Sequence, residues 1–297
     1  MRYQIFHQII YQYDRPTVLD LHRIQMRPVS NVAQSLRQFS LQISPMPELL
    51  VENVELDGNA VLQSWFSEQP TQALSIQMIA EVETYRSNPF LYRLDPRAVT
   101  LPIDYPASLA HSLHPYLTGL VSGGGLQAID PTAMQLAQEI WLSTQGDLVG
   151  FLSELNQQIY HQCEYSVRDT GSPYPPGITW QQKAGSCRDY AVLFMETCRA
   201  MGLASRFVSG YHVNSEGDQT LQENLHLHAW CEVYLPGAGW RGYDPAHGVA
   251  VADNYITLFA APTPRDTAPI VGSRKTKGVQ SQLHYQLKIQ ILAGDAG

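Results

Sequence analysis

The sequence predicts an α+β protein, with a β-sandwich over residues 1–95, a connector over residues 96–130, and a core of helices packed on an antiparallel sheet over residues 131–297. Two observations support this prediction. Apolar and polar residues alternate through much of the first region, which is typical of half-buried strands. From residue 131 the apolar residues follow helical spacing, and from residue 204 onward they alternate again.

The N-terminal region has the pattern of short strands joined by turns. Polar and apolar residues alternate over residues 3–11, 37–43 and 74–82. Asp57-Gly58-Asn59 lies between two apolar runs, where a hairpin turn is expected. Several strands with turn signals in one region predict a β-sandwich.

The predicted connector is rich in proline and glycine. Four prolines lie between residues 95 and 115, and three glycines follow at residues 123–125. At the other end of the chain, residues 279–292 alternate again. This pattern predicts a final strand, which is assigned to the core although either domain could hold it.

Three helices are predicted in the core. The first begins at Pro131, the second follows the N-cap residue Asp147, and the third covers residues 187–201 and ends before Gly202. The residues expected to face inward are Met134, Ala137, Ile140 and Trp141 on the first helix, and Leu148, Leu152, Leu155 and Ile159 on the second.

Cys187 lies in the first turn of the third predicted helix. Ser186 fits the N-cap position, and Asp189 three residues later closes a capping box with it. The free N–H groups and the dipole of a helix N-terminus favour a thiolate over a thiol, and so does a neighbouring imidazolium. Because the thiolate is the nucleophile, Cys187 is the candidate nucleophile. Taken alone, it would be interpreted as a small core residue.

His228 and Asp244 lie on two predicted strands that the turn at residues 235–239 joins into a hairpin. The midpoint between them is residue 236, inside the turn, so a hairpin centred there sets Asp244 directly opposite His228. A carboxylate beside an imidazole fixes the tautomer and orientation of the ring, as in a triad of nucleophile, base and orienting group. Each residue alone has a structural explanation, but Cys187, His228 and Asp244 together favour acyl transfer.

Four stretches of the chain resemble a known family. They are Gly185-Ser186-Cys187-Arg188-Asp189-Tyr190-Ala191, residues 199–211, residues 228–240, and Tyr243-Asp244-Pro245. On these stretches the chain resembles the bacterial transglutaminase-like proteins, whose superfamily includes tissue transglutaminases, peptide N-glycanases and proposed cysteine peptidases. Residues 253–256 resemble the segment that follows in the bacterial branch, whereas residues 259–268 depart from its usual glycine-arginine-aspartate run.

The resemblance covers residues 147–272 and has consequences for fold and site. It implies a papain-like transglutaminase core, and the N-terminal strands are similar to the β domain of the bacterial branch. It also implies Cys187 as nucleophile, His228 as base and Asp244 as the orienting carboxylate, in agreement with the interpretation from the residues themselves.

Composition disfavours several kinds of partner. The 297-residue chain has 19 basic and 27 acidic residues and a net charge of −8, which argues against nucleic acid and anionic membrane surfaces. The start of the chain lacks the apolar segment of a signal peptide, and no apolar run is long enough to span a membrane. Because no signal peptide is apparent, we expect a cytoplasmic protein with reduced thiols. The four cysteines lack metal-ligand spacing, and no cofactor is expected. The oligomeric state is left open.

Further residues near the triad are considered as site residues. His226 lies two residues before His228 on the same strand face, so it competes for the role of base. The two histidines also suggest a metal, but no third and fourth ligand follow at useful spacing, and no metal is predicted. Trp230 and Trp180 are candidate substrate or oxyanion residues, although core packing explains both. The backbone N–H of Cys187 is one expected oxyanion donor.

The sequence therefore predicts cysteine-dependent acyl transfer from an amide through a thioester. Hydrolysis of a peptide, isopeptide or amide is the leading reaction, because water is always present and an amine acceptor needs its own channel. The alternatives are transfer to an amine, as in a protein-glutamine gamma-glutamyltransferase, a non-catalytic peptide-binding module that retains the three residues, and a zinc hydrolase.

Overall fold

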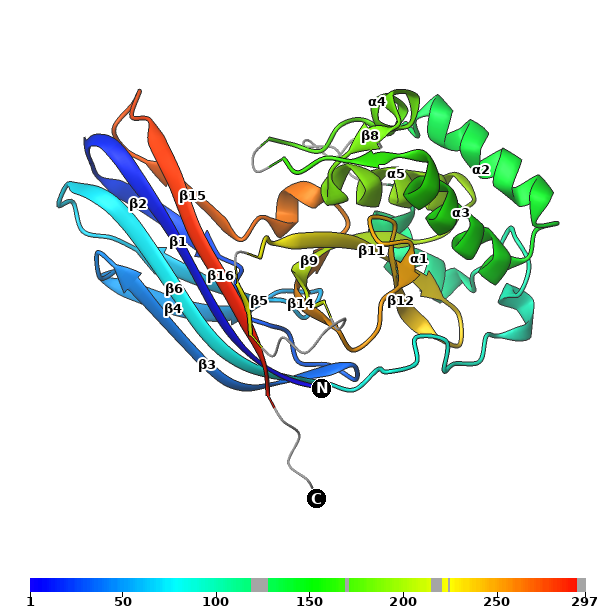
Figure 1. The fold of residues 1–297 in the computed structure, drawn as a ribbon, viewed down its shortest axis with the longest axis horizontal. Helices are drawn as coiled ribbons and strands as arrows, with labels where there is room; N and C mark the ends of the chain where they lie inside the picture. The colour runs from blue at the N-terminus through cyan, green and yellow to red at the C-terminus, as the bar shows by residue number, and fades with distance from the viewer. Residues whose placement is uncertain (119–127, 169–170, 215–220, 224, 293–297) are drawn as a thin grey trace, which may run out of the picture.

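The structure, a computed structural model, describes residues 1–118, 128–168, 171–214, 221–223 and 225–292. It has the predicted α+β class, with antiparallel sheets at one end and a helical layer over a further sheet at the other (Figure 1). Among the described residues, the helices are all too short or too polar to cross a membrane.

Two facing sheets form the predicted β-sandwich. The larger has the order β10 (Leu221–Glu223), β16 (Ser281–Leu292), β1 (Arg2–Thr17), β6 (Thr71–Thr84) and β3 (Gln34–Ser44). The smaller has the order β15 (Ile270–Arg274), β2 (Leu19–Ile24), β5 (Ala60–Trp65) and β4 (Leu49–Val54). The strands alternate inward and outward residues, and the inward apolar side chains of both sheets meet in one core. Burial of these side chains stabilises the sandwich.

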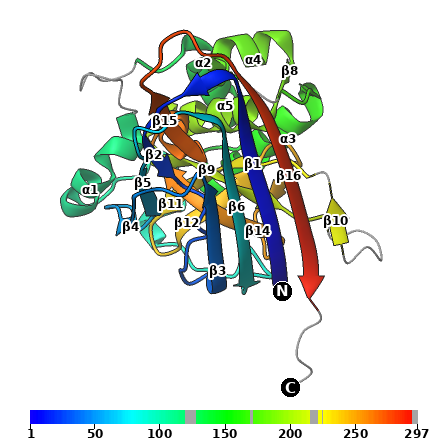
Figure 2. The ribbon, with the colours of Figure 1, turned by 90° about the vertical axis from the view of Figure 1, so that its left-hand side faces the viewer.

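The sandwich also contains strands from the C-terminal part of the chain. β16 runs antiparallel beside β1 along nearly its whole length, with Ile289 opposite Ile5, as the neighbouring long strands in Figure 2 show. β15 pairs with β2 in the smaller sheet. The predicted assignment of residues 131–297 to a single core is therefore wrong for this segment. Its alternating apolar residues complete the apolar face of β1 and β6 instead.

The predicted connector contains ordered structure. A 3-10 helix, η1 (Pro96–Ala98), and α1 (Ala107–Thr118) lie within it. Leu113 and Tyr116 of α1 are buried against Ala204 of the core, which ties this segment to the core. The three glycines at residues 123–125 lie outside the described residues.

Four helices build the core layer: α2 (Pro131–Ser143), α3 (Leu148–Gln162), α4 (Pro176–Gln182) and α5 (Cys187–Ala200). All four residues predicted to face inward on α3 are fully buried, and Asp147 caps the helix by accepting the N–H of Gly150 at 2.6 Å. On α2 the prediction is partly wrong, because Met134 is 54% exposed. The helix turns Ala133 and Leu136 inward instead.

The core sheet is antiparallel and supports α5. Its order is β13 (Val249–Ala250), β12 (Gly239–Asp244), β11 (His228–Leu235), β9 (Ser205–His212) and β14 (Tyr255–Ala261). α5 packs on β11 and β9 and is flanked by α2, α3 and α4, so it is buried on more than one face. The buried positions of α5 include Glu196 and Arg199, which form an ion pair at 3.2 Å.

The core and the sandwich pack against each other. Tyr211 of β9, together with Ile256 and Phe259 of β14, shares a buried cluster with β1 and β6. This cluster packs β9 and β14 of the core sheet directly against the larger sheet of the sandwich. The two parts therefore form opposite walls around the residues described next.

Candidate active site

Cys187 is the first residue of α5 and is 8% exposed. The predicted capping box is confirmed, since Asp189 Oδ2 accepts the Ser186 N–H at 2.8 Å and its Oγ–H at 2.7 Å. The second oxygen, Oδ1, accepts from Arg168 at 2.6 Å and from the Tyr174 N–H at 2.7 Å. Asp189 therefore fixes both the helix start and the segment that passes over it.

The hairpin of β11 and β12 brings His228 and Asp244 together, but not in the predicted register. Cys231 pairs with Tyr243 and Leu235 with Gly239, so the hairpin is centred on residue 237. Continuing this register sets Asp244 opposite Trp230, two residues from His228. The predicted direct opposition is therefore wrong. The two residues are diagonal neighbours on one face, and a diagonal contact lies within reach of a long side chain.

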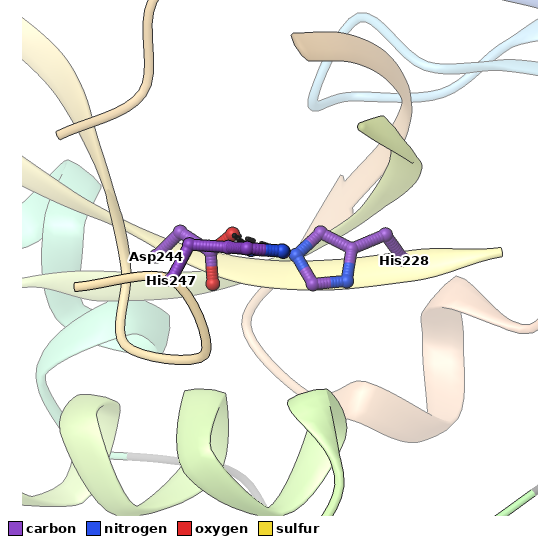
Figure 3. A group of neighbouring side chains, drawn as sticks. All are labelled: His228, Asp244 and His247. Carbon is purple, nitrogen blue, oxygen red and sulfur yellow. Dashed lines mark hydrogen bonds and ion pairs between the residues drawn. The ribbon is translucent and has the colours of Figure 1, made fainter. Parts of the chain in front are cut away.

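The contact itself is short. His228 Nε2 lies 2.7 Å from Asp244 Oδ2, and His247 reaches the same oxygen from the turn after β12 (Figure 3). This bond leaves Nδ1 as the ring nitrogen of His228 available to the thiol of Cys187, with which the histidine also forms a hydrogen bond. Burial alone would lower the pKa of His228, but the charge and hydrogen bond of Asp244 and the contact with Cys187 raise it to about 10.

The thiol of Cys187 is held by three groups. Burial opposes its ionisation, but the hydrogen bond and charge of His228, the N–H of Ala229 and the hydroxyl of Tyr165 together lower the pKa of the thiol below its usual value. The arrangement favours a thiolate beside an imidazolium. Chemically, this is a nucleophile paired with a group that can give up or take a proton.

Asp244 is fully buried and accepts four hydrogen bonds. His228, His247 and the hydroxyl of Tyr255 each lie 2.7 Å from Oδ2, and the N–H of Ala246 lies 2.9 Å from Oδ1. Burial raises the pKa of the carboxyl, but the charges and hydrogen bonds of the two histidines outweigh it and hold the pKa well below its usual range. The carboxylate therefore remains charged.

Within the described residues, the side chains of His228, Asp244 and His247 form a candidate metal site. One ligand atom from each of His228, Asp244 and His247 lies within 4.8 Å of the others. Two imidazoles and a carboxylate form a donor set that zinc accepts. His247 is the third ligand that the spacing of the earlier histidines did not reveal. Both imidazoles here hydrogen-bond to one carboxylate oxygen.

The remaining candidate residues make their described contacts with groups other than the thiol. His226 contacts the hydroxyl of Tyr285 on β16, so it is His228 that meets the thiol. Trp230 is fully buried in a small cluster with Val208 and Tyr255. Trp180 packs under Lys183, whose Nζ lies 2.9 Å from the ring centre. Neither tryptophan is among the described residues that line the cleft over Cys187.

Tyr165 is the site residue that sequence analysis missed. It lies on the two-residue strand β7 (Glu164–Tyr165), which pairs in parallel with β8 (Ala184–Gly185) just before Cys187. Its hydroxyl lies close enough to the thiol and to the backbone N–H of Cys187 to interact with both. Burial and the interactions with the Cys187 thiol and the Asp244 carboxylate raise the pKa of Tyr165, against the opposing effect of the Cys187 backbone N–H, so the hydroxyl keeps its proton and remains a donor.

A cleft of about 1590 Å³ opens over Cys187 between the core and the larger sheet. One wall comes from β7, the segment before α4 and the start of α5. The opposite wall comes from the inner faces of β1 and β16, and residues 262–269, including η2 (Pro264–Thr267), line a third side.

The two halves of the chain match two family descriptions. Residues 134–245 match the transglutaminase-like superfamily core, and residues 3–83 match the bacterial transglutaminase-like N-terminal region. The chain belongs to the transglutaminase-like superfamily, as the sequence motifs predict. This membership supports cysteine-dependent acyl transfer or hydrolysis as the general class of reaction.

The chain is also similar to individual proteins. An uncharacterized protein of Mycobacterium tuberculosis is 25% identical over 302 residues, which span 99% of this chain and 94% of that protein. An uncharacterized protein of Mycobacterium leprae is 31% identical over 99 residues, or 33% of this chain and 34% of its own. The crystal structure of a proposed cysteine protease from Cytophaga hutchinsonii has the same fold, with a TM-score of 0.68, 19% identity and 98% of each chain covered.

Proposed function

We propose that this protein hydrolyses an amide bond through a thioester on Cys187, with His228 as base and acid and Asp244 as the orienting carboxylate. One observation supports the proposal above all. The thiol contacts an imidazole whose other nitrogen lies 2.7 Å from a buried carboxylate, at the base of a cleft. This is the order of contacts that nucleophile, base and orienting group need.

The acylation step begins from the thiolate and imidazolium. The Cys187 sulfur attacks the carbonyl carbon of the amide and forms a carbon–sulfur bond, and the carbonyl oxygen becomes an oxyanion. When the oxyanion collapses, the carbon–nitrogen bond breaks. The leaving amine takes the proton from His228, and the acyl group stays on sulfur.

Deacylation uses the same residues in reverse. Neutral His228 takes a proton from water, and the resulting hydroxide attacks the thioester carbon. The carbon–sulfur bond breaks, the thiolate and imidazolium form again, and the product leaves as a carboxylic acid that ionises in solvent. Asp244 keeps its charge throughout and stabilises the imidazolium.

The oxyanion needs two donors. The backbone N–H of Cys187 is the first, at the start of α5, where the helix dipole favours negative charge. We propose the Tyr165 hydroxyl as the second, because it contacts the same N–H in the resting protein. An acyl oxygen that displaces this hydroxyl from the N–H would then receive both hydrogen bonds.

An activity screen of peptides, isopeptides and glutamine amides with wild type and Cys187→Ala tests this proposal. Hydrolysis that disappears in Cys187→Ala and persists in EDTA is the expected result. Incorporation of a labelled amine in place of hydrolysis would identify a transglutaminase. Loss of activity in EDTA would identify a zinc hydrolase, and a thiol no more reactive than free cysteine would favour a non-catalytic binding module.

A further inference from the structure

We propose that the cleft binds an extended polypeptide through apolar side chains on both sides of the reacting amide, and that the N-terminal sandwich supplies one wall of this binding site. This inference rests on the proposed function and adds a substrate class to it. It also gives the sandwich a role beyond stability.

Exposed apolar side chains gather on both walls of the cleft. On the core side Tyr165, Val167 and Tyr174 are 48%, 62% and 38% exposed. On the sandwich side Leu283 and Tyr285 of β16 are 40% and 37% exposed. Large apolar side chains that remain open to solvent in one groove indicate a surface that another molecule covers.

Charged side chains of the cleft are held by other groups of the protein. Arg168 pairs with Asp189 at 2.6 Å, and Arg188 donates to the carbonyl of Gly171 at 2.7 Å. Asp266 Oδ2 accepts from the hydroxyl of Thr263 at 2.7 Å. These charges already hold the cleft walls in place, so apolar contact rather than charge pairing distinguishes the ligand.

The size of the cleft favours a polypeptide over a small molecule. Its volume of about 1590 Å³ exceeds the roughly 300–1,000 Å³ of typical small-molecule sites.

The cleft also borders an open sheet edge. β10 pairs with β16 only at Lys288–Gln290, and among the described residues Ser281–His284 have no strand partner on that edge.

The sequence of this edge lacks the usual protection against strand addition. Residues 279–287 contain no proline, lysine, arginine, aspartate or glutamate. Exposed edges normally carry such residues, because an unprotected edge accepts another strand. A substrate segment that continues beyond β10 along β16 would gain backbone hydrogen bonds, while its alternate side chains reach the apolar walls.

Affinity labelling tests the inference without knowledge of the natural substrate. The probe is a chloroacetyl pentapeptide of leucine, phenylalanine and alanine residues, compared with a chloroacetyl pentapeptide of glycine and serine and with chloroacetamide. The thiolate displaces chloride from each, and intact-protein mass spectrometry gives the rate. We expect the apolar peptide to modify Cys187 at least about tenfold faster than either comparison reagent, which corresponds to roughly 1.4 kcal/mol.

Matched variants identify the wall. Leu283→Lys should remove most of the acceleration, and Val167→Lys on the opposite wall should do the same. Ile79→Lys is the control, because Ile79 is 38% exposed and lies on β6 of the same sheet but not among the cleft-lining residues. Melting temperatures near that of the wild type show that each variant is folded.

The outcomes separate this inference from the proposed function. A Cys187 that chloroacetamide modifies no faster than free cysteine would overturn the proposed function. Fast chloroacetamide labelling without acceleration by the apolar peptide would overturn only the inference, and so would equal acceleration by the glycine–serine peptide or full acceleration in Leu283→Lys. The rate of Cys187 labelling is also compared with the oligomeric state measured by light scattering. A labelling rate that falls as the protein forms dimers would instead assign this surface to a second copy of the chain.

Discussion

Replacing Asp244 with asparagine removes a negative charge that three donors share. Each donor of His228, His247 and Tyr255 lies 2.7 Å from Oδ2. Asparagine keeps one carbonyl oxygen. If that oxygen takes the place of Oδ2, the amide NH2 faces the N–H of Ala246, which now donates to Oδ1 at 2.9 Å. Two donors then meet, and the charge that supports the imidazolium is gone.

The size of the effect follows from these contacts. A hydrogen bond to a charged group contributes about 1.5–3 kcal/mol, so the ratio of the thiolate–imidazolium pair to the neutral pair should fall roughly 10- to 150-fold. Iodoacetamide should therefore alkylate Cys187 of Asp244→Asn more slowly at pH 7, by up to roughly 150-fold. The unpaired N–H costs about 1–3 kcal/mol, which lowers the melting temperature by roughly 2–12 °C without loss of the fold.

The assay compares alkylation rates of wild type, Asp244→Asn and the control Asp266→Asn by mass spectrometry. Asp266 also lines the cleft, but its partner is Thr263, and its variant should match the wild type. An unchanged alkylation rate in Asp244→Asn at an unchanged melting temperature would refute the reasoning. Asp244 would then serve only the turn, and Cys187 and His228 would act as a pair.

Three further predictions use other residues. Tyr165→Phe should reduce turnover by roughly 10- to 1000-fold, because the hydroxyl stabilises the oxyanion. Chloroacetamide labelling of Cys187, which forms no oxyanion, should fall much less. Equal losses of turnover and labelling rate would contradict this role. His228→Gln should slow iodoacetamide labelling strongly and His226→Gln should not, and the opposite pattern would assign the base to His226. Burial holds the pKa of His7 at about 4 instead of 6.5, so the unfolded chain binds an extra proton between these values. The free energy of unfolding should therefore fall by roughly 3 kcal/mol from this residue as pH drops through this window. In denaturant titrations, the fall should be smaller for His7→Gln than for the wild type. Equal falls in the two proteins would reject the assignment to His7.

The start of α5 was predictable because its signals are local. Ser186 and Asp189 are three residues apart and satisfy each other, and helical spacing follows at once. The contact of His228 with Asp244 was also predictable from one hairpin. Its register was not, because Gly237 and Gly239 both have positive φ, of 86° and 72°, and set the geometry of the turn.

Other features depend on contacts that sequence order does not reveal. Tyr165 reaches the thiol through parallel pairing of two short strands, Glu164–Tyr165 with Ala184–Gly185, and neither strand has a periodic pattern. The strand Ser281–Leu292 was visible as alternation, but its partner β1 lies at the other end of the chain. His247 stands in a turn, where a histidine has no pattern that distinguishes it from a solvated residue.

The central claim is that Cys187 is an activated nucleophile, and competitive alkylation tests it most directly. Cys163 is an internal reference, because the two cysteines are equally accessible: Cys163 is 9% exposed and Cys187 is 8% exposed. They differ in ionisation, since burial raises the pKa of the Cys163 thiol. After substoichiometric iodoacetamide at pH 6–7, peptide mass spectrometry should find the label on Cys187 before the other three cysteines, and faster than on free cysteine. Preferential labelling of Cys163, Cys198 or Cys231, or a Cys187 rate no greater than that of free cysteine, would contradict the account.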